Sequence, residues 1–350
     1  MAVDISMRPL AFRVLRALSH QHFVSGADLA ATFGVSRSAI SDALMDATAQ
    51  GVDIFKLTRR GYRLAEPLDL LDIEALRFHL GDAVRRVDVD IIETIDSTNS
   101  ELTKRAAAGA ASGSCIAAEI QTDGRGRRGR SWKSRLATSL TFSLLWRFDR
   151  GAAQLGGLSL VVGLALVRAL RNMGVSNVGV KWPNDIVVGE KKLGGVLIET
   201  QGDMLGPSAV VIGVGMNVRM GEALIAEINQ PATDIQAQMT KTISRSILLA
   251  AALQELVPLL EQFGKTGFAP FRAEWVACHS LHERDIRVIR EYGESFEAFV
   301  RDVAPDGSLI VDSADRCVLL SSGEISVRDA STPRNSGAVN FRFPEQEIRS

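Results

Sequence analysis

The chain has few of the residues that build a disulfide framework or a zinc site, and it lacks an apolar run long enough for a membrane span. Its 350 residues contain only three cysteines, which are far apart and odd in number, and five histidines without metal-ligand spacing. This usage fits a reducing compartment. The longest apolar run, residues 155–170, is too short to cross a bilayer and contains Arg168, so it predicts a buried helix.

Several catalytic and targeting signatures are also missing. We find no Walker or Rossmann fingerprint and no Ser/His/Asp arrangement. The N-terminus carries Asp4 and lacks an apolar segment, so we expect no signal peptide. Because no protein nucleophile is apparent, catalysis would depend on positioning the reactants and on stabilising the charge that develops in the transition state. We therefore expect a cytoplasmic protein with no membrane partner and no tightly bound prosthetic group.

Charge is balanced overall but concentrated in one stretch. The formal net charge is −1, so no general preference for nucleic acids or membranes follows. Between Gln121 and Arg135, however, six Lys/Arg stand against one acid. Residues 124–132 read Gly-Arg-Gly-Arg-Arg-Gly-Arg-Ser-Trp. Glycine lets the backbone approach a ligand closely, and arginine binds carboxylates and phosphates through a planar fork.

A basic, glycine-rich stretch can also be a flexible linker or an RNA-binding tail. Here strand-like apolar runs flank it on both sides, at residues 115–120 and 140–146. This context favours an anion-binding loop within a folded sheet.

Residues 8–64 show the pattern of a winged helix-turn-helix. The first helix is expected from Pro9 to Ser19, Ser25 is expected to cap the second and Ser36 the third. Two short strands follow, at residues 54–57 and 62–64. Because such a fold places its third helix in the major groove, we expect DNA contacts at the start of that helix and at the basic wing tip. The expected residues are Ser36, Arg37, Ser38, Arg59 and Arg60.

A three-helix packing module without a DNA role is the alternative. Residues 1–66 carry eight Lys/Arg and six Asp/Glu, a net charge of only +2. Asp42 and Asp46 on the third helix would repel phosphate. The helix-turn-helix geometry still favours DNA, with modest affinity unless two copies bind together.

Short polar side chains follow the strand expected at residues 87–95. Thr98 with Glu101 predicts a capping box, in which case Ser97, Thr98 and Asn99 stand at a helix N-terminus. Free N–H groups and small polar side chains there can hold a urea or an amide. Gln121, at the end of the next strand, could meet the same ligand.

Further along, residues 178–185 predict a strand ending in Trp-Pro-Asn-Asp, and a turn at Gly189-Glu190 makes a hairpin back through residues 193–199. Lys181 and Lys192 would lie at one end of this hairpin. Asp185 offers an oxygen ligand for Mg²⁺, although Asn-Asp alone is more often a turn. Trp132 could be a core aromatic or stack on a purine.

Four motifs in this order and spacing resemble biotin–protein ligases. They are Asp-Ser-Thr-Asn, Gly-Arg-Gly-Arg-Arg-Gly-Arg-x-Trp, Lys-Trp-Pro-Asn-Asp and Lys-Leu-x-Gly-x-Leu-x-Glu. Together with the winged helix they are similar to the bifunctional bacterial form, a ligase that is also the biotin operon repressor. The resemblance covers roughly residues 8 to 329. It implies an α+β fold: an N-terminal winged helix, a central mixed sheet with helices of the class II synthetase-like type, and a C-terminal SH3-like β-barrel.

The resemblance also implies a reaction and its residues. Biotin and MgATP would give biotinyl-5′-adenylate, and the biotinyl group would pass to a lysine of a biotin carboxyl carrier protein. Biotin would be bound by Ser97, Thr98, Asn99, Gln121, Arg125, Gly126, Arg127 and Lys192, of which Arg127 and Lys192 are the expected catalytic residues. The nucleotide would be bound by Arg130, Trp132, Lys181 and Asn217, with Asp185 for Mg²⁺.

The expected domains are 1–66 for DNA binding, 67–275 for catalysis and 276–329 for the barrel, whose strands we expect at 286–290, 295–303, 308–312 and 318–326. Residues 330–350 extend beyond the family pattern and are expected to be disordered. Implied partners are the carrier protein, operator DNA and a second copy in a ligand-dependent homodimer. Two alternatives stay open. The protein could be a ligase with a vestigial winged helix, or a lipoate ligase-like acyl transferase, against which the arginine loop and the winged helix argue.

Overall fold

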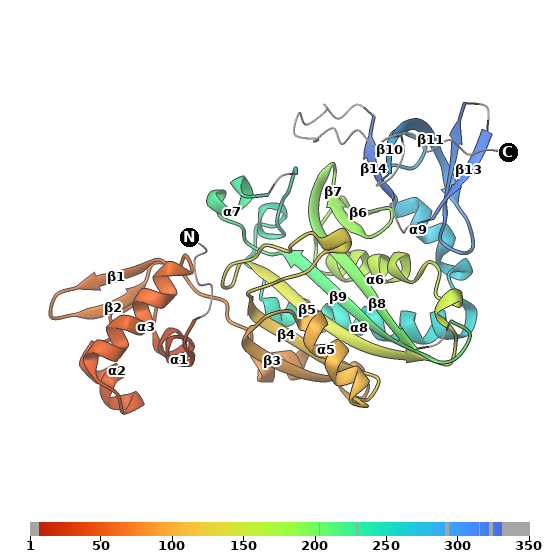
Figure 1. Ribbon diagram of the computed structural model, residues 1–350. Helices are drawn as coiled ribbons and strands as arrows, with labels where there is room; N and C mark the ends of the chain where they lie inside the picture. The colour runs from red at the N-terminus through yellow and green to blue at the C-terminus, as the bar shows by residue number, and fades with distance from the viewer. Residues whose placement is uncertain are drawn as a thin grey trace, which may run out of the picture.

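A computed structural model describes residues 7–202, 204–228, 230–290, 294–314, 316–321 and 325–330. Residues 331–350, nearly all of the expected disordered tail, lie outside the described residues. Three helices and a two-stranded hairpin come first, followed by a large sheet with helices on both faces and a smaller C-terminal sheet (Figure 1).

The N-terminal part has the expected winged-helix elements. They are α1 (Pro9–Ala17), α2 (Gly26–Phe33), α3 (Arg37–Ala49), β1 (Ile54–Leu57) and β2 (Gly61–Leu64). The Ser25 hydroxyl accepts hydrogen bonds from the Ala27 and Asp28 amides, and the Ser36 hydroxyl accepts one from the Ala39 amide, so both expected helix caps are confirmed. The first helix ends at Ala17, two residues earlier than expected.

The central sheet is mixed, with strand order β3-β4-β5-β9-β8-β7-β6. Only the β3–β4 pair is parallel, and every other neighbouring pair is antiparallel. Its strands are β3 (Asp88–Ile95), β4 (Ser114–Gln121), β5 (Ser139–Phe148), β6 (Val178–Lys181), β7 (Asp185–Val188), β8 (Lys191–Gly202) and β9 (Ser208–Asn217).

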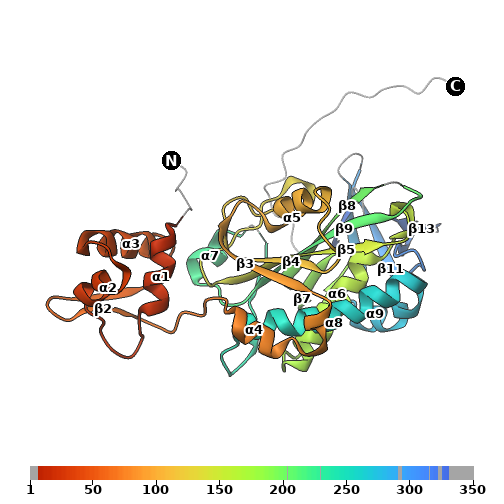
Figure 2. The ribbon, with the colours of Figure 1, turned by 90° about the horizontal axis from the view of Figure 1, so that it is seen from below.

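Helices cover the two faces of this sheet unequally. In Figure 2, α5 (Thr98–Ala107) lies on one side, while the long helices α6 (Leu158–Asn172) and α8 (Arg245–Thr266) lie together on the other. The shorter helices are α4 (Ile73–His79), α7 (Glu222–Ala226) and α9 (Arg272–Cys278). Helix α6 buries eleven residues, from Leu158 to Leu170, which confirms the buried helix expected from the apolar run.

Helix α8 is the one described helix that is long and apolar enough to cross a membrane. More than half of its most apolar window, 56%, is buried inside the protein. It packs against α6 and α4, as a core helix of a globular domain does. Its length and composition therefore have a packing explanation.

The C-terminal strands form a five-stranded antiparallel sheet of order β13-β12-β11-β10-β14. Its strands are β10 (Asp285–Arg290), β11 (Phe296–Val303), β12 (Leu309–Ser313), β13 (Arg316–Leu320) and β14 (Ile325–Asp329). The single strand expected over residues 318–326 is wrong. The chain makes two strands there, and β14 pairs with the edge of β10 that β11 leaves open, where Val327 is buried.

A second correction concerns the hairpin after residue 178. The structure has two consecutive hairpins, since Trp182, Pro183 and Asn184 turn the chain between β6 and β7 before the expected turn at Gly189. This extra turn pairs Lys181 with Asp185 across the β6–β7 ladder.

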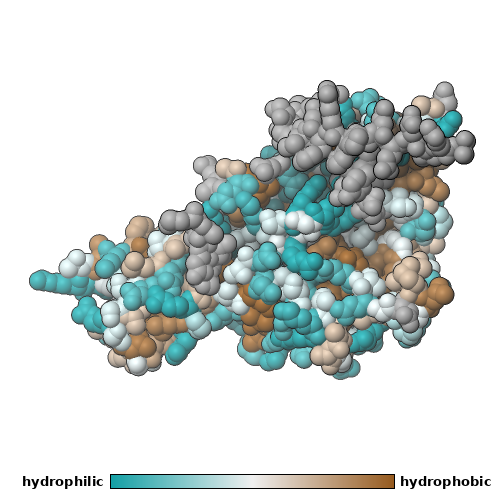
Figure 3. Space-filling view, in the orientation of Figure 1, coloured by the Kyte–Doolittle hydropathy of each residue, from teal (hydrophilic) through white to brown (hydrophobic). Residues whose placement is uncertain are grey.

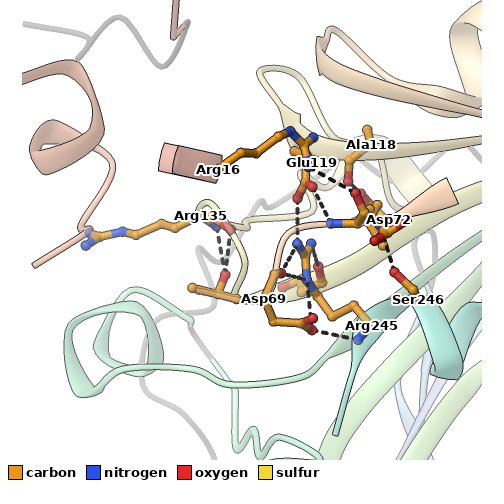
Figure 4. A network of polar contacts seen from close by, with 12 residues as sticks. Arg16, Asp69, Asp72, Ala118, Glu119, Arg135, Arg245 and Ser246 are labelled. Carbon is orange, nitrogen blue, oxygen red and sulfur yellow. Dashed lines mark hydrogen bonds and ion pairs between the residues drawn. The ribbon is translucent and has the colours of Figure 1, made fainter. Parts of the chain in front are cut away.

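A buried ionic network ties the segment after the winged helix to the central sheet (Figure 4). Arg245, at the start of α8, has a fully buried side chain whose Nη2 lies 2.6 Å from Glu119 Oε2 on β4, also fully buried. Arg245 further donates to the Ser139 carbonyl at 3.2 Å and, through Nε, to the Asp69 carbonyl at 2.9 Å. The other Glu119 oxygen accepts from the Leu71 amide at 2.5 Å. The Arg245–Glu119 pair thus joins α8, β4, β5 and the connecting segment at residues 69–71.

We predict that Arg245→Met destabilises the fold by about 3–5 kcal/mol, because it leaves the Glu119 carboxylate buried without its cation. Urea denaturation followed by circular dichroism measures the change. The double variant Arg245→Met/Glu119→Leu should regain part of the loss, since it removes the unpaired charge as well. Wild-type stability in the single variant would contradict this account.

Candidate active site

All thirteen residues expected at the catalytic site line one pocket of about 570 Å³. This volume lies in the usual range for a small-molecule site. The residues come from α5, from the ends of β4, β6 and β9, from β7 and β8, and from the loop at residues 124–132. They are Ser97, Thr98, Asn99, Gln121, Arg125, Gly126, Arg127, Arg130, Trp132, Lys181, Asp185, Lys192 and Asn217.

The floor of the pocket is a buried chain of uncharged polar groups. Gln121 Oε1 accepts hydrogen bonds from the Thr98 amide at 2.8 Å and from the Thr98 hydroxyl at 3.1 Å. The Ser143 hydroxyl on β5 lies 2.7 Å from Thr98 Oγ1 and 2.5 Å from Asn99 Oδ1. Buried polar groups in such a chain hold one another in fixed orientations.

The start of α5 differs from the expected capping box. The cap is Ser97, whose hydroxyl accepts from the Ser100 amide, and Thr98 is the first helical residue. The Thr98 hydroxyl is therefore turned toward Gln121 instead of the helix backbone. The sequence spacing placed the N-cap of this helix one residue too late, at Thr98 instead of Ser97, because serine and threonine are both favourable N-cap residues.

Glycines on β9 let the side chains of Asn99 and Trp132 approach the sheet closely. A Cβ on Gly213 would lie 2.2 Å from Asn99 Oδ1, and one on Gly215 would lie 2.6 Å from the Trp132 ring. The Trp132 ring therefore occupies the space that a side chain at Gly215 would fill. Its indole Nε1 is buried and has no hydrogen-bond partner among the described residues.

The arginine loop folds back on itself between β4 and β5. The Gly126 amide donates to the Arg130 carbonyl and the Trp132 amide to the Gly124 carbonyl, each at 2.7 Å. Arg127 Nη1 donates to Asn184 Oδ1 at 3.0 Å, which joins the loop to the β6–β7 turn. Burial, followed by the charges of Arg128 and Arg130, lowers the pKa of Arg127 from its ordinary value.

Cations far exceed anions around the pocket. Eight Lys or Arg residues line it against two acids, Asp185 and Glu227. Lys192 Nζ lies 2.6 Å from Asp185 Oδ1. Burial lowers the pKa of Lys181, and the neighbouring Asp185 opposes this by raising it. An excess of partly buried positive charge suits a ligand with several negative charges.

Some residues at the site escaped the sequence analysis. Ser143, which is fully buried and supports Thr98 and Asn99 from behind the pocket, was visible only as a hydroxyl inside the apolar strand at residues 140–146. Arg328 on β14 lines the pocket beside Lys181, yet no local motif marks it. Glu227, which lies 2.6 Å from Arg135 Nη2 and so ties the α7 segment to the end of the loop, was equally unmarked.

The expected DNA contacts lie apart from this pocket, on the winged helix. Ser36, Arg37 and Ser38 are exposed at the start of α3, and Arg59 and Arg60 are exposed at the wing tip. The β1–β2 hairpin projects away from the central sheet, and its far tip is hydrophilic (Figures 1 and 3). Asp46, expected to repel phosphate, forms an ion pair with Arg8 at 2.6 Å.

The fold and pocket define a ligase of the biotin and lipoate type with an added DNA-binding module. A model of the biotin/lipoate A/B protein ligase family matches residues 91–217, and a helix-turn-helix domain model matches residues 11–63. A solved biotin protein ligase from Aquifex aeolicus, in complex with biotin and ATP, has a TM-score of 0.61 and 26% identity; the match covers 69% of this chain and 99% of that one.

Sequence comparison identifies the family within this class of ligases. The chain is 34% identical over 318 residues to the bifunctional ligase/repressor BirA of Escherichia coli, covering 91% of this chain and 97% of that protein. It is 31% identical to the biotin–[acetyl-CoA-carboxylase] ligase of Mycobacterium tuberculosis, over 75% of this chain and 97% of the relative. The chain belongs to the biotin protein ligase family, in its bifunctional ligase/repressor form.

His279 supports the strand that carries Lys181. It is buried, stacks on Trp275 with ring centroids 4.6 Å apart, and accepts a hydrogen bond from the Trp182 amide at 3.4 Å. Burial, followed by the neighbouring His282 and Lys181, lowers the pKa of His279 to about 3. The imidazole is therefore neutral in the folded protein at any moderately acidic pH.

We predict that this neutral histidine makes the fold sensitive to acid. The unfolded chain takes up a proton near pH 6.5, whereas the folded protein does so only near pH 3, so stability falls as pH drops between these values. The slope is at most about 1.4 kcal/mol per pH unit. Urea denaturation from pH 7 to pH 5 should show a shallower dependence for His279→Gln, while His79→Gln on α4 serves as control. Equal slopes in wild type and His279→Gln would refute the prediction.

Proposed function

We propose that the chain activates biotin with MgATP to biotinyl-5′-adenylate and transfers the biotinyl group to one lysine of a biotin carboxyl carrier protein. One observation carries this proposal: an uncharged polar floor and a cationic wall share the same pocket of about 570 Å³. Biotin needs both, because it has a neutral ureido ring at one end and a carboxylate at the other.

The polar floor would bind the ureido ring. Ser97, Thr98, Asn99 and Gln121 are each at most 8% exposed and offer donors and acceptors at the start of α5. A buried site of this kind discriminates strongly against ligands that leave its polar groups unpaired. Lipoate has no ureido ring, so the floor favours biotin over lipoate.

The cationic wall would bring two anions together. In the first step a biotin carboxylate oxygen attacks the α-phosphorus of ATP, the new C(O)–O–P bond forms, and the bond to pyrophosphate breaks. Lys192 and Arg127 would offset the repulsion between carboxylate and phosphate and stabilise the charge on the reacting phosphate. Arg130, Lys181 and Arg328 would hold the triphosphate, and Trp132 and Asn217 the adenine.

Mg²⁺ would enter as part of the MgATP substrate. No group of three His, Cys, Asp or Glu side chains suited to a metal occurs in the described part of the chain. A single carboxylate such as Asp185 is sufficient for Mg²⁺ held mainly by phosphates and water. Asp185 also pairs with Lys192, so the residue that would hold Mg²⁺ lies beside the residue that would contact the biotin carboxylate.

The second step needs the mixed anhydride to be protected from water. The acceptor lysine amine attacks the acyl carbon, an amide forms and AMP leaves. Arg125, Gly126 and Arg127 lie in the loop that would cover the anhydride until the carrier lysine arrives. The hydrogen bonds across this loop would let it close as a unit.

We further propose that the protein is cytoplasmic, has no membrane partner and represses an operator when the adenylate is bound. Ser36, Arg37 and Ser38 would meet the major groove, and Arg59 and Arg60 the flanking phosphates. A ligand-dependent homodimer would bind the operator, and the supporting feature is β3, which is an edge strand of the central sheet among the described residues, since edge strands readily pair. The C-terminal sheet would be an SH3-like barrel that presents Arg328 to ATP.

We predict that the purified protein with biotin and MgATP releases pyrophosphate and labels a carrier domain. Lys192→Gln should lower kcat/KM for adenylation by about 100-fold to 1,000-fold, as for loss of one transition-state donor. Lys191→Gln, one residue away and exposed, is the matched control and should stay active. Excess lipoate should not compete. Absence of pyrophosphate release in the wild type would refute the ligase proposal.

We predict a second, separable outcome for DNA. The protein with biotin and MgATP should retard a fragment carrying the operator upstream of biotin-synthesis genes. Arg37→Ala should weaken this binding by about 1–3 kcal/mol if the side chain contacts a base. Arg301→Ala removes an equal charge from the C-terminal sheet and should have no effect. No retardation at low salt would leave the winged helix without this role.

A further inference from the structure

Glu199 connects the floor of the pocket to the arginine loop. It lies on β8, and 26% of its side chain is exposed. One oxygen, Oε2, accepts a hydrogen bond from Asn99 Nδ2 at 2.8 Å. The other, Oε1, lies 2.9 Å from Arg125 Nη2. No step of the proposed reaction uses this carboxylate, so its position calls for a separate explanation.

At the floor, Glu199 fixes which way the Asn99 amide faces. Asn99 is 3% exposed, and its Oδ1 lies 2.5 Å from the Ser143 hydroxyl. An ionised carboxylate can only accept, so it holds the amide NH₂ toward itself and the carbonyl toward Ser143. Asn99 Oδ1 occupies the space that a side chain at Gly213 would fill, since a Cβ there would lie 2.2 Å from it.

At the loop, the contact with Arg125 is a double one. Arg125 Nη1 also lies 3.5 Å from Glu199 Oε2 and 3.4 Å from the Ser100 hydroxyl. Paired contacts between a guanidinium and a carboxylate are both strong and directional. Arg125 bridges to Ser131 across the loop, so holding Arg125 holds both arms of the loop.

We propose that Glu199 is a positioning residue that latches the arginine loop onto the biotin-binding floor. The latch orders Asn99 and places Arg125 so that the loop covers the bound acyl-adenylate. Arg125 then acts through Glu199 to hold the loop closed, while Arg127 and Lys192 face the reacting groups. The inference rests on the proposed ligase function and assigns Glu199 to the retention of its intermediate.

Adenylate retention tests the latch. Adenylate formed from biotin and MgATP is chased with excess unlabelled biotin, and its release is timed. Glu199→Gln keeps an acceptor oxygen for Asn99 but loses the charge that binds Arg125, so release should be about fivefold to tenfold faster with biotin affinity near that of wild type. Glu199→Ala loses both contacts, so it should speed release and also weaken biotin binding.

The matched control is Glu274→Gln. Glu274 and Arg168 form another double ion pair, with Arg168 Nε 2.8 Å from Glu274 Oε1, and neither residue lines the pocket. A purely structural loss of an ion pair would affect both variants alike. Release at the wild-type rate in Glu199→Gln, or equal acceleration in Glu274→Gln, would overturn the proposal.

A double-mutant cycle tests whether Arg125 acts through Glu199. The variant Arg125→Gln/Glu199→Gln should release adenylate no faster than Arg125→Gln alone, because each single change already opens the latch. Multiplicative effects of the two substitutions would show that they act separately, and the latch would be rejected.

Limited proteolysis of the ligand-free protein gives a readout that does not depend on ligase activity. Trypsin should cleave after Arg127, Arg128 or Arg130 about fivefold faster in Glu199→Gln than in wild type or Glu274→Gln, since proteolysis follows the population of the open loop. Mass spectrometry identifies the cleaved bonds. Unchanged cleavage in Glu199→Gln would reject the latch even if the protein is a ligase. Faster cleavage together with a failed ligase assay would reject only the proposed ligase function.

Discussion

The active site depends on a continuous line of hydrogen bonds, buried except at its Glu199 end, that runs across the sheet. It begins at Gln121 on β4, passes through Thr98 at the start of α5, reaches Ser143 on β5 and continues through Asn99 to Glu199 on β8. Four elements that are distant in sequence are thereby fixed to one another. Each group would be costly to bury alone, so the line is stable only when it is complete. The helix start that would receive a ureido ring is thus held in place before any ligand arrives.

The second constraint is electrostatic. Eight basic and two acidic side chains line the pocket, and their like charges repel one another unless they are paired. Lys192 is paired with Asp185 and Arg125 with Glu199. Each of these carboxylates can give up its cation to an anionic ligand or keep it as a structural contact. The burial of Asn99 beside Glu199 favours the structural role there, whereas Asp185 faces the pocket and suits exchange with MgATP.

Much of the site could be predicted from sequence because its motifs are local. The alternation of glycine and arginine over residues 124–130, the polar run at Ser97–Asn99 and the spacing to Lys192 each signal chemistry within a few residues. The winged-helix elements were equally visible, since capping serines mark helices at their first residue. The sequence does not show which residues and strands that lie far apart in the chain come into contact. Neither Ser143 nor Arg328 has a local signature, and the separate paths of β13 and β14 depend on which edge of β10 was left open.

The buried pair of Arg245 and Glu119 shows why those long-range contacts matter for function. Glu119 lies two residues before Gln121 on β4, and Ser139, whose carbonyl accepts from Arg245, begins β5 just after the arginine loop. Both ends of the arginine loop are therefore anchored by the Arg245–Glu119 pair, which also binds Asp69 and Leu71. Ile120 and Leu136, on either side of the loop, pack into the core of the winged helix. The loop that would cover the adenylate and the module that would bind DNA are thus fixed to the same two strand ends.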